Sequence, residues 1–158
     1  MQKITPFLWF DSNAEEAVAF YLSVFKDGKI HTTTRYPEGG PSQAGSVMTI
    51  AFELQGEQFV ALNGGPGFPF TQAISLVVNC ESQEEIDHYW EKLAADGGEP
   101  IQCGWLKDKF GMSWQIVPTI LSKLMEDKDR EKSKRVMQAM LKMKKIDIEG
   151  LKRAYAQQ

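Results

Sequence analysis

Cysteine and histidine are scarce in this sequence. Its 158 residues include two cysteines, Cys80 and Cys103, and two histidines, His31 and His88. The cysteines form no CxxC pair and stand away from the histidines, so neither a disulfide framework nor a zinc motif is expected. Unpaired thiols are typical of a reducing compartment, and we therefore expect a cytoplasmic protein.

Long apolar runs and nucleotide-binding motifs are also missing. No stretch reaches the roughly 20 apolar residues of a membrane-spanning helix, and the N-terminal MQKITPFLWFDS lacks a signal-peptide cleavage site. Neither the P-loop pattern nor the Rossmann glycine pattern occurs. The sequence therefore predicts no membrane partner and no nucleotide held by such a loop.

Charge is unevenly distributed along the chain. Residues 1–122 carry 7 Lys and Arg against 15 Asp and Glu, a net charge of −8, and residues 123–158 carry 11 against 6, a net charge of +5. A basic tail can bind nucleic acid, but the acidic body offers no basic face that would extend the patch. We expect no nucleic-acid partner, and a tail that packs on an acidic surface, its own or that of a partner.

The first half of the chain has the pattern of one strand, one helix and three strands. Residues 4–10 (ITPFLWF) are β-branched and aromatic, as is typical of a strand. Ser12 and Glu15 are spaced as a capping box, and apolar residues then recur at helical spacing until Asp27-Gly28. The three expected strands, with a hairpin turn at 55–57 between the last two, are 29–36, 47–54 and 58–62.

The same pattern occurs again in the second half. A strand at 73–78 (AISLVV) precedes a second capping box, Ser82 with Glu85, and a helix that ends at 96–98. The first strand of each half aligns with the other at an offset of 68 residues, the capping boxes at 70 and the apolar helix positions at 69. This agreement indicates a duplication. The remaining expected strands are 99–101, 104–107 and 113–118.

A helical tail follows the two repeats. Helices are expected over 120–126, 130–144 and 148–156, with Asp129 and Asp147 as caps for the last two. One side of the middle helix is apolar and rich in methionine, which predicts a packing face against the body or, as we favour, against a second subunit in a homodimer. That face comprises Val136, Met137, Met140, Leu141 and Met143.

Three stretches of the sequence are ITPFLWFDSNAEEAVAFY, ISLVVNCESQEEIDHYWEKL and CGWLKDKFGMSWQIVP. They resemble the PhnB-like branch of the vicinal-oxygen-chelate (glyoxalase/bleomycin resistance/dioxygenase) superfamily, in the group labelled 3-demethylubiquinone-9 3-methyltransferase domain, and VMQAMLKMKKIDI in the tail is similar to those proteins too. The resemblance implies an α+β fold in which duplicated βαβββ modules form a cupped mixed sheet. It implies paired modules over 1–119, the first about 1–67 and the second about 68–119, a C-terminal helical extension over 120–158, and a homodimer.

The resemblance also locates the superfamily's metal ligands, which lie on the first and last strand of each module. By register these positions are Thr5, Val60, Ala73 and Gln115. Because Gln115 alone carries a metal-ligating group, we expect no superfamily-type metal and no other cofactor. The methyltransferase label finds no support either, since the glycine-rich stretch 64–69 leads into a strand and not into a helix N-terminus.

Cys103 is the strongest candidate nucleophile in the sequence. Lys107 and Lys109 follow it and could lower the pKa of its thiol. A catalytic thiol also needs a base, and neither His31 nor His88 is placed to serve as one. We therefore favour an inert Cys103.

Aromatic residues predict a small-molecule pocket. Strand alternation turns Phe7 and Trp9 toward the concave side of the first sheet. Together with Trp105, Lys107 and Gln115, these two residues are expected to line one pocket between the modules. Such an apolar surface with a few polar groups suits a small ligand, whereas the alternative is that the tryptophans simply fill a core.

Three functional hypotheses follow. The first is a protein that binds a small, partly apolar metabolite without a metal, with or without catalysis. The second is sequestration of a compound without chemistry, as in drug-resistance relatives. The third is a metal-dependent lyase or dioxygenase, or a ubiquinone-pathway methyltransferase, as the resemblance would suggest.

Overall fold

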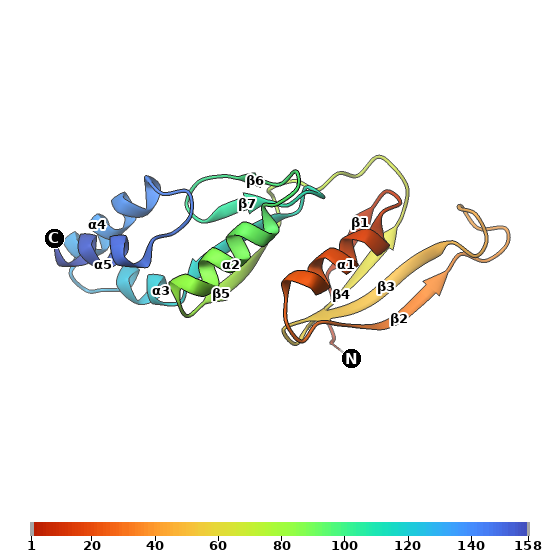
Figure 1. The fold of residues 1–158 in the computed structure, drawn as a ribbon, viewed down its shortest axis with the longest axis horizontal. Helices are drawn as coiled ribbons and strands as arrows, with labels where there is room; N and C mark the ends of the chain where they lie inside the picture. Colours follow the sequence, from red (N-terminus) through yellow and green to blue (C-terminus); the bar gives the residue numbers. More distant parts are fainter. Residues whose placement is uncertain (1, 158) are drawn as a thin grey trace. The chain divides into compact units, whose positions relative to one another are not determined.

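The computed structural model describes residues 2–157 and divides into two compact units, residues 1–69 and 70–158. In each unit a strand and a helix are followed by three strands (Figure 1). The first unit contains β1 (Phe7–Phe10), α1 (Ala14–Val24), β2 (Lys29–Arg35), β3 (Val47–Leu54) and β4 (Glu57–Asn63).

The second unit repeats this series and adds three helices. Its repeated part contains β5 (Ser75–Cys80), α2 (Gln83–Leu93), β6 (Glu99–Pro100), β7 (Trp105–Lys107) and β8 (Ser113–Pro118). The added helices are α3 (Ile120–Met125), α4 (Arg130–Leu141) and α5 (Ile148–Ala156).

The two sheets have the same topology. Their strand orders are β1-β4-β3-β2 and β5-β8-β7-β6. In each sheet the first strand pairs in parallel with the last, and the other pairs are antiparallel. The predicted α+β fold with duplicated βαβββ modules and a helical extension is confirmed.

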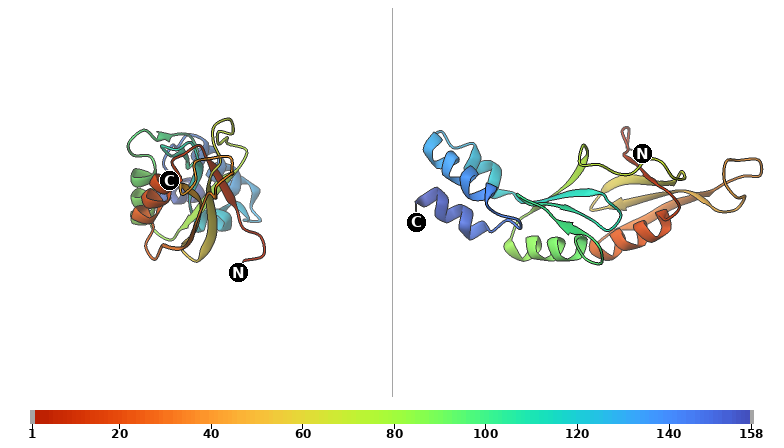
Figure 2. Two further views of the ribbon diagram at one scale, coloured as in Figure 1. Left: turned by 90° about the vertical axis from the view of Figure 1, so that its right-hand side faces the viewer. Right: turned by 90° about the horizontal axis from the view of Figure 1, so that it is seen from above.

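One face of each sheet is covered by a helix of its own unit (Figure 2). Alternate residues of the strands are buried toward that helix, for example Leu8 and Phe10 of β1 and Phe52 of β3. In the second unit Leu106 and Ile116 occupy the same kind of position. The opposite faces of the sheets carry the remaining residues of each strand, among which are the predicted site residues.

The two helices begin in different ways. In α2, the Ser82 hydroxyl accepts a hydrogen bond from the Glu85 N–H at 3.2 Å, so the second capping box is confirmed. The first capping box is wrong. The N-cap of α1 is Asn13, whose side chain makes no capping bond.

A residue of the last strand caps α1 instead. The Asn63 side-chain oxygen accepts from the Ala14 N–H at 2.8 Å, and its amide group donates to Glu15 at 2.7 Å and to the Val47 carbonyl at 3.1 Å. Glu15 is therefore bound by a side chain 48 positions away in the chain and does not reach back to Ser12.

The tail forms a small core of its own within the second unit. The predicted cap Asp129 is confirmed, because its carboxylate accepts from the Glu131 N–H, whereas the Asp147 side chain makes no capping bond. The predicted apolar face of the tail is only partly buried, because Met137 and Leu141 are exposed. Val136, Met140 and Met143 pack with other residues of the tail, which include Leu124, Ile146, Leu151 and Tyr155.

None of the helices described over residues 2–157 has the length and apolar character that crossing a membrane requires.

Candidate functional site

The open face of the first sheet carries Phe7 and Trp9, which alternate with the buried residues of β1. Phe7 is 62% exposed, whereas Trp9 is half-buried. The Trp9 indole N–H donates to the Gly65 carbonyl at 2.8 Å, and the ring meets Phe68 edge-on, with 4.9 Å between centroids. A Cβ at Gly64 would lie 2.4 Å from the Trp9 ring, so only glycine fits there. Trp9 is thus held by the loop that follows β4.

The open face of the second sheet brings together the other three predicted residues. Trp105 of β7 is paired across the ladder with Gln115 of β8, and Lys107 lies two residues further along β7. The Gln115 amide donates to the Ser75 hydroxyl at 2.9 Å. Lys107 forms an ion pair with Glu99 at 3.4 Å, so its charge is already partly compensated.

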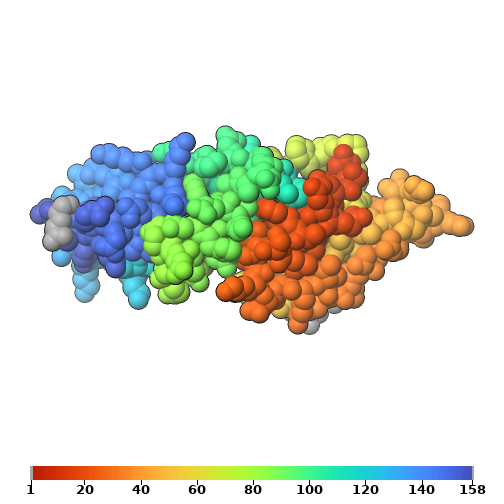
Figure 3. All heavy atoms as spheres, in the orientation of Figure 1, coloured from red at the N-terminus to blue at the C-terminus, as the bar shows by residue number. Residues whose placement is uncertain are grey.

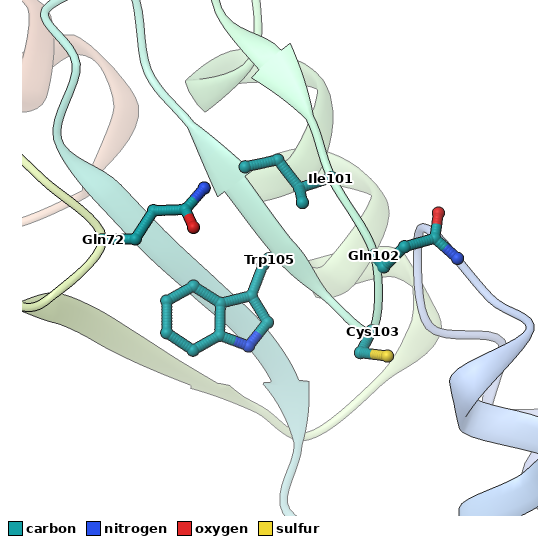
Figure 4. Close-up of a pocket in the computed structure, with 5 residues that line it drawn as sticks. All are labelled: Gln72, Ile101, Gln102, Cys103 and Trp105. Atoms are coloured by element: carbon teal, nitrogen blue, oxygen red, sulfur yellow. The ribbon is translucent and has the colours of Figure 1, made fainter.

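A hollow of about 320 Å³ lies beside Trp105 (Figure 4). The close-up shows the indole nitrogen on the side of the ring nearer to Cys103. Within residues 2–157 the structure records no hydrogen bond from this indole N–H, whereas those of Trp9 and Trp114 are both bonded. The residues that line the hollow are Gln72, Ile101, Gln102, Cys103 and Trp105.

The structure therefore divides the five predicted residues between two sheets. Trp105, Lys107 and Gln115 share one face in the second unit, and Phe7 and Trp9 share one face in the first. The sequence prediction did not include Gln72, Ile101 and Gln102. The tight turn before Trp105 was the available signal, because it places Ile101 and Trp105 opposite each other.

Cys103 lies at the hollow, and the two lysines that follow it make contacts elsewhere. Lys107 is paired with Glu99, and Lys109 lies over the Phe110 ring at 5.5 Å. The other thiol, Cys80, is fully buried, and burial together with nearby Glu85 and Glu81 raises its pKa to about 12. Of the two thiols, Cys103 is therefore the more accessible.

A buried carboxylate holds the loop between β7 and β8. Asp108, 2% exposed, follows β7 in the loop to β8. One oxygen accepts from the Phe110 and Met112 N–H groups at 2.9 and 3.1 Å, and the other accepts from the Trp114 indole at 2.8 Å. Sequence reasoning missed Asp108, since a single acidic residue beside a glycine turn resembles an ordinary surface loop.

The residues at the superfamily's metal positions do not fit a divalent ion. In the parallel ladders Phe7 lies beside Val60, and Val77 lies beside Gln115. The sequence register assigned these first-strand positions to Thr5 and Ala73. That assignment is wrong, because Thr5 precedes β1 and Ala73 precedes β5. Among residues 2–157 no group of three or more His, Cys, Asp and Glu side chains could hold a metal. The donor set is one neutral amide, which does not compete with water for such an ion.

The glycine-rich stretch also does not fit a methyl-donor cofactor of the nucleoside type. Residues 64–69 lead through a short loop into β5, and the next helix, α2, begins only at Gln83. A glycine turn binds such a cofactor against a helix N-terminus, and no helix follows this turn directly.

Comparison with known proteins supports the family assignment. The family model described as 3-demethylubiquinone-9 3-methyltransferase matches residues 2–117. A solved structure from Bacillus cereus, a putative 3-demethylubiquinone-9 3-methyltransferase described as a PhnB protein, is 42% identical with a TM-score of 0.66. The match covers 75% of this chain and 100% of the Bacillus protein.

More distant structures share the fold alone. A Pseudomonas aeruginosa protein is 21% identical over 75% of this chain and 98% of its own, with a TM-score of 0.61. A fosfomycin resistance protein from Listeria monocytogenes, solved with Mn(II) and sulfate, is 15% identical over 73% and 92%, with a TM-score of 0.51. No functionally curated protein matched the chain.

The family match covers most of the chain, and the duplicated modules agree with it in topology. The chain therefore belongs to the family described as 3-demethylubiquinone-9 3-methyltransferase and is a PhnB-like protein.

Proposed function

We propose that this protein binds a small, partly apolar molecule at the hollow beside Trp105, without a superfamily-type metal. The observation that carries the proposal is the half-exposed indole with its unbonded N–H, next to two side-chain amides and an aliphatic wall. An apolar ring flanked by a few hydrogen-bonding groups is the usual composition of a small-molecule site. Gln115 and Lys107 extend this surface along the same face.

The chemistry of the lining favours binding without turnover as a second candidate function. The five lining residues provide two amides, one thiol, one indole and one aliphatic side chain. They include no carboxylate or imidazole that could act as a general base toward Cys103. Recovery of a bound compound unchanged after long incubation would favour sequestration, and recovery of a product would favour an enzyme.

We also propose that a second copy of the chain covers the open sheet faces. Phe7 is 62% exposed and Val77 is 49% exposed, and they occupy equivalent positions, each beside the last strand of its module. Exposed apolar side chains that recur on a sheet face are typical of an interface. Light scattering should give the mass of a dimer, and a monodisperse monomer would contradict this.

A cytoplasmic location agrees with the cysteines. Cys80 and Cys103 are both free thiols, and free thiols persist in a reducing compartment.

The binding proposal can be tested with isotope-labelled indole groups. We expect β-naphthol, a bicyclic ring with one hydroxyl, to shift the NMR signal of the Trp105 indole N–H. The signals of Trp9 and Trp114 should move little because their N–H groups are already bonded, and that of Trp90 because its side chain is buried. Equal shifts of all the tryptophan signals, or none up to the solubility limit of the compound, would contradict the proposed site.

The absence of a superfamily-type metal has its own test. Elemental analysis of purified protein should find no stoichiometric divalent metal, because the four metal positions on the first and last strands offer one neutral amide, that of Gln115. One ion per chain that survives dialysis against a chelator would overturn this part of the proposal.

A further inference from the structure

The wall of the hollow contains a tight turn with an unusual backbone conformation. Cys103 has a φ of 58° and Gly104 a φ of 82°, so two successive residues are left-handed. The Trp105 N–H closes the turn by donating to the Gln102 carbonyl at 3.0 Å. A non-glycine residue in this region is disfavoured and persists where surrounding contacts hold it.

The C-terminal tail provides those contacts. The Cys103 N–H donates to the Met143 carbonyl, and the Gly104 N–H donates to the Lys144 carbonyl, both at 2.8 Å. Both acceptors lie in the connection between α4 and α5. The two N–H groups at the centre of the turn are thus satisfied by the tail and not by the sheet.

The tail also encloses the turn sterically. Ile146 is fully buried, and a Cβ on Gly104 would lie 3.1 Å from its Cγ1 atom and 2.8 Å from the Ile116 carbonyl oxygen. There is therefore no room for a side chain between the tail and β8. The position of Ile146 limits where the turn can lie.

The start of α2 anchors this part of the tail. The Gln83 amide donates to the Ile146 carbonyl at 3.0 Å and accepts from the Ile148 N–H at 2.9 Å. Lys145 forms an ion pair with Asp87 of α2 at 2.9 Å. Figure 3 shows the atoms of the tail in continuous contact with those of α2.

The tail lies outside the family match. That match ends at residue 117, and three quarters of this chain suffice to cover the whole Bacillus cereus protein. The contact between residues 143–148 and the hollow is therefore a feature of the extension and does not belong to the matched modules.

We propose that residues 143–148, anchored by Gln83, position the turn 102–105 and thereby set the affinity of the hollow for its ligand. Gln83 and Ile146 are positioning residues in this account, because they act on Trp105 and Cys103 through the turn. The inference rests on the binding function proposed above. It extends that function from the paired modules to the tail.

The main test is Gln83→Ala in the full chain, which removes both hydrogen bonds to the tail. Loss of two such bonds should raise the hydrogen-exchange rates of the Cys103 and Gly104 amides about tenfold. The Cys103 thiol should also react faster with DTNB, while Cys80 stays silent because it is fully buried. The affinity for β-naphthol, read from the Trp105 indole signal, should fall about fivefold.

Gln138→Ala is the matched control. Gln138 lies exposed on α4, so the same substitution there should leave exchange, thiol reactivity and affinity unchanged. Gln83→Glu keeps the acceptor for the Ile148 N–H but puts a carboxylate oxygen against the Ile146 carbonyl and Asp87, and it should change the three readouts at least as much as Gln83→Ala. If Gln83 had only a structural role, Gln83→Ala would lower the free energy of unfolding. The exchange rates of the Cys103 and Gly104 amides would then rise no more than those of other amides in the unit.

The readouts separate this inference from the binding proposal. If β-naphthol does not bind the unsubstituted protein, the binding proposal fails, and with it the link from tail to affinity. Unchanged exchange and thiol reactivity in Gln83→Ala would overturn the positioning role whether or not the compound binds. Faster exchange with unchanged affinity would also overturn it.

A milder variant covers the case in which Gln83→Ala does not fold. Ile146→Val removes one methylene at the contact with Gly104 and keeps the backbone hydrogen bonds. It should show the same three changes in the same direction and to a smaller extent. No change in a folded Ile146→Val protein would contradict the proposal.

Discussion

The two units share one strand order but complete their polar contacts with different residues. In the first, Asn63 of the last strand caps α1 from a distance, and the hairpin β3–β4 turns on two residues, Gln55 and Gly56, both left-handed. In the second, Ser82 caps α2 locally, and the connection β7–β8 is a longer loop held by the buried Asp108.

This difference shows which features a duplication retains. The apolar alternation that buries one sheet face against a helix is present in both units and gives both the same topology. Helix caps and turns need only satisfy local N–H groups, and several side chains can do so. The second unit differs further in having a tail bonded to the turn before β7 and a hollow beside that turn.

The largest effect is expected from Asp108→Ala. The substitution removes the acceptor of three N–H groups in a buried site, and it should lower the free energy of unfolding by about 4 kcal/mol. Urea denaturation measures this, with Glu91→Ala, exposed on α2, as a control of near-zero effect. A loss under about 1 kcal/mol would show that the loop does not depend on this carboxylate.

The two caps should differ in their contribution. Asn63→Ala leaves the Ala14 N–H without its acceptor and removes two further bonds, so it should cost about 2–3 kcal/mol. Ser82→Ala should cost about 1 kcal/mol, the usual value of a local cap. Both are measured by urea denaturation.

Asn13→Ala is the matched control for this pair. Asn13 occupies the N-cap position of α1 but makes no side-chain capping bond, so its loss should cost less than about 0.5 kcal/mol. A loss for Asn13→Ala as large as that for Asn63→Ala would mean that the first unit is capped locally after all.

The two tryptophans of the open faces should also differ. Trp9→Ala removes a hydrogen bond to Gly65 and the contact with Phe68, and it should cost about 2 kcal/mol. Trp105→Ala should cost about 1 kcal/mol or less, because its half-exposed ring lines the hollow and its N–H is unbonded among the described residues. A larger loss for Trp105 than for Trp9 would favour a core role for Trp105.

The last comparison concerns Cys80 and pH. Burial raises the pKa of its thiol from 9.0 to about 12, so the unfolded chain releases the proton at a lower pH than the folded protein does. The stabilising contribution is complete below about pH 9 and is lost as the pH rises toward 12. Urea denaturation at increasing pH should show a steeper decline for the unsubstituted protein than for Cys80→Ala, and equal slopes would contradict this.

The sequence predicted the fold in detail, and it placed some residues of the candidate site on the strands where the structure has them. Periodicity located the helices and strands because one buried face imposes it, and the repeat offsets located both modules. The caps could not be read with the same success, since Ser12 and Glu15 have the right spacing while a distant Asn63 makes the bonds. Trp105 and Gln115 were placed together by strand register.

The rest of the site depends on contacts that a sequence pattern does not contain. Gln72 reaches the hollow from the segment before β5, and the turn at Cys103 is held by carbonyl groups some 40 residues later in the chain. Backbone groups carry no residue signature, so the link between the tail and the hollow becomes visible only in the folded structure.

The central claim is that the second unit holds a small-molecule site beside Trp105. Crystals soaked with β-naphthol test it most directly. We predict electron density for the ring in the hollow, in contact with Trp105 and within reach of Gln72 and Cys103. Density for the compound only at the open face near Trp9, or an empty hollow at a saturating soak, would contradict the account.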